Sequence, residues 1–294
     1  MRTAPRYIPT RTSEVRRIQL RSRRLVTGDL MGQYRSAFRG TGLVFTDIRE
    51  YQPGDDVKHI HWKATARTGK VFVKSYEEDR QLRVLLAVDA SASMRALDSK
   101  ASFGKALEFT SLIGALTQGG NDLLGLSLFG KETLSYLPPK SGAKRIQQIL
   151  SALMGADSSH LGTDIGAGLK QISLTLRKPS IVFVLSDFFS TDFHDELRSL
   201  SAVHDVILVQ LESALGKIED CGLVSFVDAE SGEHVVVDTS AKSVRDGWEA
   251  ALQSRRIALH DVARRNGADH IVISENTMQP LLSLMKERAR RIAR

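Results

Sequence analysis

Three oxygen-bearing side chains, Asp89, Ser91 and Ser93, follow a short apolar run at residues 84–88. Five apolar residues in a row are typical of a strand that is buried on both faces of a parallel sheet. The three side chains then lie on the loop leaving the carboxyl end of that strand, where open α/β sheets bind ligands. Oxygen ligands suit a hard cation such as Mg²⁺. A cap on the following helix explains the same pattern equally well.

Two later segments favour the cation site. Gly162, Thr163 and Asp164 precede an amphipathic helix, and Ser186-Asp187 ends a second apolar run at residues 181–185. Five residues at these places, taken in chain order, resemble the metal-ion-dependent adhesion site of von Willebrand factor A domains: Asp89, Ser91, Ser93, Thr163 and Asp187.

This resemblance implies one Mg²⁺ or Mn²⁺ ion per chain. The hydroxyls of Ser91, Ser93 and Thr163 would hold it, and Asp89 and Asp187 would act directly or through water. An open coordination position would then accept a carboxylate from a partner protein.

The hydrophobic pattern predicts an alternating α/β domain over residues 81–294. The resemblance implies that this domain is of the von Willebrand A (Rossmann-like) type. The expected strands are 83–88, 123–129, 133–137, 181–186, 205–211 and 269–273. The expected helices are 100–117, 143–154, 165–176, 193–202, 241–265 and 278–291. The short link at residues 130–132 predicts one antiparallel edge strand in a mostly parallel sheet. A hairpin at 223–228 and 234–238 is expected as an insertion.

Residues 38–80 form a second, smaller segment with strand-like stretches at 59–63 and 71–76. Its polar and aromatic residues resemble the signature of the bacterial domain-of-unknown-function 58 family: Arg49, Glu50, Tyr51, Pro53, Gly54, Asp55, Asp56 and Trp62. His61 departs from that signature, because the family usually carries an acidic residue before the tryptophan. We expect a small β-rich unit that packs on the sheet domain with Trp62 buried. His59 and His61 would share a strand face, but no third metal ligand lies nearby in the sequence.

Composition is that of an ordinary globular protein, with 294 residues, 42% hydrophobic and 26% charged. The single cysteine, Cys221, excludes an internal disulfide and suits a reducing compartment. No apolar stretch approaches the roughly 20 residues that cross a bilayer. The start of the chain lacks the apolar core of a signal peptide. We therefore expect a cytoplasmic protein.

Positive charge is concentrated at the start of the chain. Residues 1–40 hold ten arginines, no lysine and two acidic residues, a net of +8, whereas the whole chain carries +7. We expect residues 1–37 to form a basic, partly helical arm that docks an acidic protein surface. The segment lacks a helix-turn-helix or zinc pattern, so no sequence-specific nucleic-acid role is expected.

These features predict a non-enzymatic, metal-dependent interaction protein. Members of the resembled family are typically encoded beside MoxR-type AAA+ ATPases, so the resemblance implies an adaptor for such an ATPase or its client. The alternative is a metal-dependent phosphoesterase or nuclease that uses the Asp89 region, with the basic arm gripping phosphates.

Overall fold

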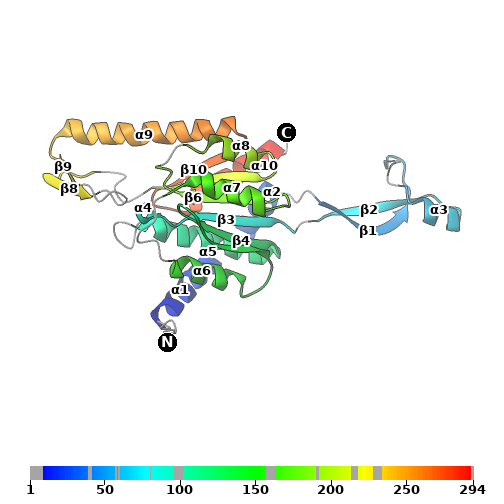
Figure 1. Ribbon diagram of the computed structural model, residues 1–294. Coiled ribbons are helices and arrows are strands. Elements are labelled where there is room, and N and C mark those ends of the chain that lie inside the picture. Colours follow the sequence, from blue (N-terminus) through cyan, green and yellow to red (C-terminus); the bar gives the residue numbers. More distant parts are fainter. Residues whose placement is uncertain are drawn as a thin grey trace.

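The protein is described by a computed structural model, which covers residues 9–38, 42–56, 58, 60–79, 81–95, 102–156, 163–189, 192–212, 218–227 and 234–292. A six-stranded sheet forms the centre of the molecule (Figure 1). Its order, β10-β7-β6-β3-β4-β5, is parallel except for β5, which pairs antiparallel with β4. The predicted α/β class and the antiparallel edge strand are therefore confirmed. The strands are β3 (Arg83–Asp89), β4 (Leu123–Phe129), β5 (Thr133–Lys140), β6 (Ile181–Ser186), β7 (Asp205–Leu211) and β10 (Asp269–Ile273).

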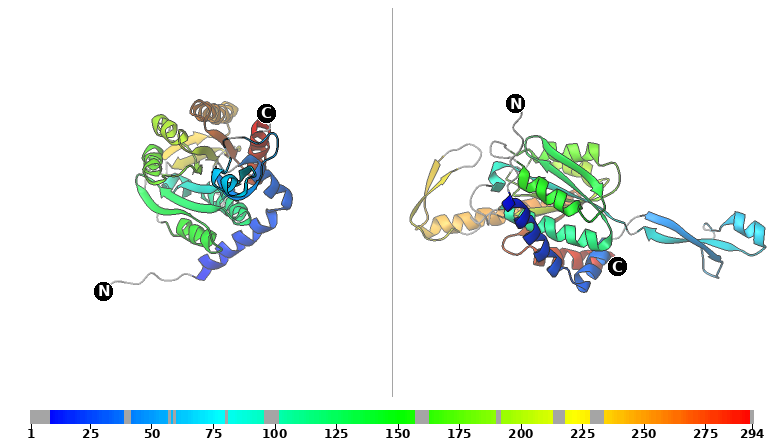
Figure 2. Two further views of the ribbon diagram at one scale, coloured as in Figure 1. Left: turned by 90° about the vertical axis from the view of Figure 1, so that its right-hand side faces the viewer. Right: turned by 90° about the horizontal axis from the view of Figure 1, so that it is seen from below.

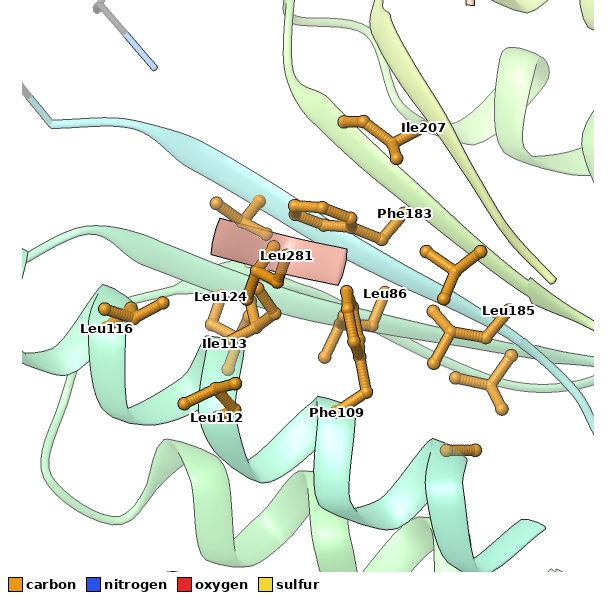
Figure 3. Packing of buried hydrophobic residues seen from close by; sticks show 14 of the residues in the cluster. Leu86, Phe109, Leu112, Ile113, Leu116, Leu124, Phe183, Leu185, Ile207 and Leu281 are labelled. Atoms are coloured by element: carbon orange, nitrogen blue, oxygen red, sulfur yellow. The ribbon is translucent and has the colours of Figure 1, made fainter. Parts of the chain in front are cut away.

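Successive side chains of a strand point to opposite faces of a sheet, so a continuous apolar run makes both faces apolar. In β3, Val84, Leu86 and Val88 belong to one buried cluster, whereas Leu85 and Ala87 belong to another. Figure 3 shows the first cluster, with side chains of the helices lying against those of the strands. A continuous apolar run is thus required in each central strand.

Helices cover both faces of the sheet (Figure 2). The first cluster includes residues of α2 (Gly28–Ala37), α5 (Ser102–Gly120), α6 (Arg145–Gly155) and α10 (Met278–Ile292). The second includes residues of α7 (Ile165–Thr175), α8 (His194–Ser201) and α9 (Lys242–Arg265). A short helix, α4 (Ala92–Arg95), follows β3.

The basic N-terminal segment is part of this core where the structure describes it. Val15 of α1 (Pro9–Leu25) and Leu30 and Tyr34 of α2 are buried in the first cluster. The Tyr34 hydroxyl donates to Asp122 Oδ2 at 3.0 Å, which ties α2 to the start of β4. The apolar positions of α1 and α2 therefore pack against the sheet domain, and exposed arginines cover their outer side.

The signature segment folds as a two-stranded antiparallel sheet, β1 (Gly42–Glu50) and β2 (Phe72–Asp79), joined through α3 (Trp62–Thr68). Of the strand expected at residues 59–63, the described part keeps an antiparallel bridge between Ile60 and Val73, and the prediction is wrong from Trp62 onward, where a helix begins. His61 caps that helix, with Nδ1 accepting the Ala64 N–H at 3.0 Å. An acidic side chain is a preferred N-cap, so His61 fills the same role here. His59 lies outside the described residues.

This unit extends away from the sheet domain instead of packing on it (Figures 1 and 2). Trp62 is 70% exposed, so its expected burial is also wrong. The signature residues brace the unit itself. Arg49 donates to both carboxylate oxygens of Asp55, at 2.8 and 2.5 Å, and Lys70 pairs with Glu50 at 2.7 Å.

A second hairpin, β8 (Leu223–Val227) and β9 (His234–Asp238), precedes α9 as predicted. The ring of Phe226 on β8 stacks on Trp248 of α9, with centroids 6.2 Å apart. Among the described residues, no helix is long and apolar enough to cross a membrane.

Candidate metal centre

The carboxyl ends of β3 and β6 meet where the direction of strand order reverses. The chain runs from β3 to β4 and β5 on one side, and then returns to β6 on the other side of β3. Such a switch point is the place where open α/β sheets bind ligands. Asp89 is the last residue of β3, Ser186 is the last residue of β6, and Asp187 follows it.

Asp89 is fully buried and its carboxylate is held by two donors. Oδ1 accepts the Ser91 N–H at 2.9 Å, and Oδ2 accepts the Ser186 hydroxyl at 2.7 Å. The loop after β3 is fixed further by the Ala90 N–H, which donates to the Phe129 carbonyl of β4 at 2.8 Å. The first aspartate of the predicted set therefore has one defined orientation.

Burial raises the pKa of Asp89 to about 6, although the hydrogen bonds from Ser186 and Ser91 oppose the shift. The neighbouring charge of Asp187 raises the pKa of Asp89 as well. Two carboxylates thus lie close enough to repel each other in a place with little water. A divalent cation between them would remove that repulsion.

The hydroxyl oxygens of Ser91 and Ser93 lie 3.0 Å apart. Two ligands at adjacent corners of an octahedral Mg²⁺ site, each about 2.1 Å from the ion, are also about 3.0 Å apart. The pair therefore has the spacing that a small octahedral cation requires of neighbouring ligands.

Asp187 lies on a strained loop. Phe188 has a φ of 53°, the left-handed region that bulky residues rarely adopt. The Phe188 N–H donates to Ser186 Oγ at 3.0 Å, and the Phe189 N–H donates to Asp187 Oδ1 at 3.3 Å. Arg255 of α9 donates to the Phe188 carbonyl at 3.2 Å. These contacts hold an unfavourable backbone conformation immediately beside the carboxylate.

Thr163 reaches the same edge from the other side of β3. Asp164 caps α7, with its Oδ1 accepting the Ala167 N–H at 2.8 Å. The Asp164 N–H donates to the Gly130 carbonyl at 3.2 Å, and Gly130 directly follows β4. Gly162 lies outside the described residues. Hydrogen bonds thus join Asp89, Ser91 and Ser93 in one network. The charge of Asp187 interacts with that of Asp89. The backbone hydrogen bond of Asp164 brings the neighbouring Thr163 to the same end of the sheet.

The donor set fits Mg²⁺ or Mn²⁺. Among the described residues, no three His, Cys, Asp or Glu side chains gather into a metal-binding group. What this edge offers is hydroxyl oxygens and two carboxylates, which is the chemistry of hard cations.

Two contributors to this edge were not predicted as site residues. Ser186 has a hydroxyl that binds Asp89 and Phe188, and its place beside Asp187 at a strand end was the available signal. Arg255 lies 68 positions after Asp187 in the sequence, on a helix whose placement follows only from the fold. No spacing rule could have identified it.

A large cavity of about 830 Å³ lies at the amino ends of the strands, on the opposite side of the sheet domain from Asp89. Arg288 crosses one side of it and binds Asp205 and Asp269, while its guanidinium lies 4.9 Å from the Phe38 ring centroid. The large cavity is therefore separate from the candidate metal centre.

The sheet order defines a von Willebrand A-like α/β domain, and this domain carries an appended hairpin unit. The chain belongs to the family described as "Protein of unknown function DUF58", which matches residues 47–258.

An uncharacterised protein of Mycobacterium tuberculosis is 27% identical over 288 residues, which cover 95% of this chain and 86% of that protein. A solved aerotolerance-related membrane protein from Bacteroides fragilis is 16% identical, covering 71% of this chain and 99% of that chain at a TM-score of 0.47. The SpRpn10 VWA domain is 14% identical, covering 70% and 95% at a TM-score of 0.38. The fold assignment rests on the sheet order, not on these distant structures.

Proposed function

We propose that this chain is a non-enzymatic protein-interaction module that binds one Mg²⁺ or Mn²⁺ ion at the switch point. Ser91, Ser93 and Thr163 would hold the ion through their hydroxyls, with Asp89 and Asp187 acting directly or through water. When bound, the ion supplies a Lewis-acidic position that can accept a carboxylate from a partner protein.

The observation that carries this proposal is the convergence of the two serine hydroxyls, 3.0 Å apart, beside the buried Asp89. A buried carboxylate with a raised pKa is costly unless something compensates its charge. Partial compensation comes from Ser186 and the Ser91 backbone. A cation at the hydroxyl pair would supply the remaining compensation of the Asp89 charge.

The proposed partner is a MoxR-type AAA+ ATPase or its client, in the cytoplasm. Support comes from membership of the DUF58 family, because the resemblance to that family implies a partner of this kind. The overhanging β8–β9 hairpin and the extended β1–β2 unit offer further surface at opposite ends of the sheet domain (Figure 1).

Co-purification tests the interaction directly. The tagged chain is co-expressed with the ATPase and captured with Mg²⁺ or with EDTA, using the wild type and Asp89→Asn. We expect capture with Mg²⁺ only, and only by the wild type. Equal capture under all four conditions would contradict a metal-dependent contact.

The enzymatic alternative has a separate readout. The wild type and Asp89→Asn are assayed for hydrolysis of a generic phosphoester with Mg²⁺. We expect no difference between the two chains. Hydrolysis that requires both Mg²⁺ and Asp89 would replace the interaction proposal with a phosphoesterase.

A further inference from the structure

The side chain of Arg255 places a positive charge beside the candidate metal centre, independently of any bound ion. Arg255 projects from α9 onto the loop that carries Asp187. Its guanidinium donates to the Phe188 carbonyl at 3.2 Å, and its central carbon lies 3.8 Å from the centroid of the Phe189 ring. Phe189 is 63% exposed, so the arginine covers one face of a ring that is otherwise open to solvent.

The positive charge of Arg255 interacts with the negative charge of Asp187. Two acidic groups act on it, Asp187 and Glu212. Glu212 is already paired, because Arg256 donates to both of its carboxylate oxygens, with Nη2 at 2.6 Å from Oε2. Of the two acidic groups, Asp187 has the stronger interaction with Arg255. Partial burial lowers the pKa of Arg255, yet a guanidinium stays charged at any physiological pH.

We propose that Arg255 is a resident positive charge that weakens cation binding at the Asp89–Asp187 edge, so that the position of α9 regulates how tightly the site holds its metal. This inference rests on the proposed function, since it concerns the affinity of the same site.

Coulomb repulsion sets the sign of the effect. A divalent ion that contacts Asp187 would be placed within several ångströms of a guanidinium that is held by both a carbonyl and a ring. The guanidinium cannot move aside without losing both contacts. In the resting chain Arg255 stabilises the charge of Asp187, and the incoming cation must share that carboxylate with it.

Within α9, the residues buried against the sheet come only after Arg255. In its last turns, Leu259 and Ala263 are buried against the sheet, whereas no residue from Lys242 to Glu249 is buried. In that half of α9, the ring of Trp248 stacks on Phe226 of the β8–β9 hairpin. A partner that binds the hairpin would pull on the helix that holds Arg255.

Titration calorimetry with Mn²⁺ tests the inference on the full chain. The variants are Arg255→Gln, which removes the charge, and Arg255→Lys, which keeps it but loses the planar contacts. Arg264→Gln is the matched control, because it makes the same charge change on the same helix, beside the large cavity at the amino ends of the strands. Melting curves confirm that each variant folds.

We expect Arg255→Gln to bind Mn²⁺ roughly tenfold more tightly than the wild type at low salt. Arg255→Lys and Arg264→Gln should stay within about threefold of the wild type. The gain should shrink at high ionic strength, because screening reduces the repulsion that the wild type suffers.

Unchanged or weaker binding by Arg255→Gln, with Mn²⁺ still bound by the wild type, would overturn the inference and assign Arg255 to bracing the loop. A different result separates the two claims: if neither chain binds Mn²⁺, the proposed metal site falls, and this inference falls with it.

Discussion

At the residue scale, one hydroxyl joins the two strand ends that form the candidate metal centre. Ser186 Oγ donates to Asp89 Oδ2 and accepts the Phe188 N–H, so it connects β3 to the strained residue after β6. Ser186 is fully buried, and no water could replace these bonds without rearrangement. Its role is to orient Asp89 and to hold the loop of Asp187.

Replacing Ser186 with alanine should lower the free energy of unfolding by about 1–3 kcal/mol, because a buried carboxylate oxygen and a buried N–H each lose a partner. Urea denaturation measures the change. Ser173→Ala is the matched control: its hydroxyl donates only to the Leu169 carbonyl within α7, at 3.1 Å, and it should cost no more than about 0.5 kcal/mol. Equal costs for the two variants would contradict the role given to Ser186.

At the scale of elements, the β1–β2 unit holds itself together. The Arg49–Asp55 pair, the Lys70–Glu50 pair and the His61 cap are all internal to it. Its aromatic residue Trp62 faces solvent on the first turn of α3. The unit therefore needs no contact of Trp62 with the sheet domain.

Trp62→Ala should change the free energy of unfolding by no more than about 0.5 kcal/mol, since little apolar area is lost from the folded state. Trp248→Ala is the comparison, because that ring stacks on Phe226 and should cost at least about 1 kcal/mol. Urea denaturation of both variants gives the result. A loss of about 3 kcal/mol for Trp62→Ala would show that the ring is buried after all.

The strands β3 and β6 were predictable because each is a short apolar run that ends at a polar residue. Residues 181–186 illustrate this, since the predicted and observed limits of β6 agree. The stretch 59–63 was not, because alternating histidine and apolar residues imitate a strand, whereas His61 caps a helix. Trp62 was misplaced because a large aromatic usually signals burial. Sequence spacing could bring Asp89 and Asp187 to one edge, but only the packing of α9 could add Arg255.

At the scale of the whole molecule, the basic charge of the N-terminal segment covers an integral helix. Val15, Gln19 and Ser22 are buried on one side of α1, and arginines occupy its exposed side. Deleting residues 1–24 would therefore remove part of the core along with the charge. Substitution of the exposed arginines separates these two effects.

A chain with four exposed arginines replaced by glutamine, Arg16, Arg17, Arg21 and Arg24, should keep its melting temperature to within a few degrees. It should elute from heparin at lower salt than the wild type, because fewer charges bind the polyanion. Capture by an acidic partner should weaken most at low salt. Unchanged elution would show that this face does not contribute to the electrostatics of binding.

The measurement that bears most directly on the whole account is titration calorimetry of Mn²⁺ binding. It compares the full-length wild type with the full-length Asp89→Ala variant. We predict one Mn²⁺ site in the wild type and no detectable binding by Asp89→Ala, with Asp89→Asn as a second variant that preserves the shape of the buried side chain. Circular dichroism verifies that both variants fold. Equal Mn²⁺ affinity in the wild type and in folded Asp89→Ala would contradict a metal centre at the carboxyl end of β3.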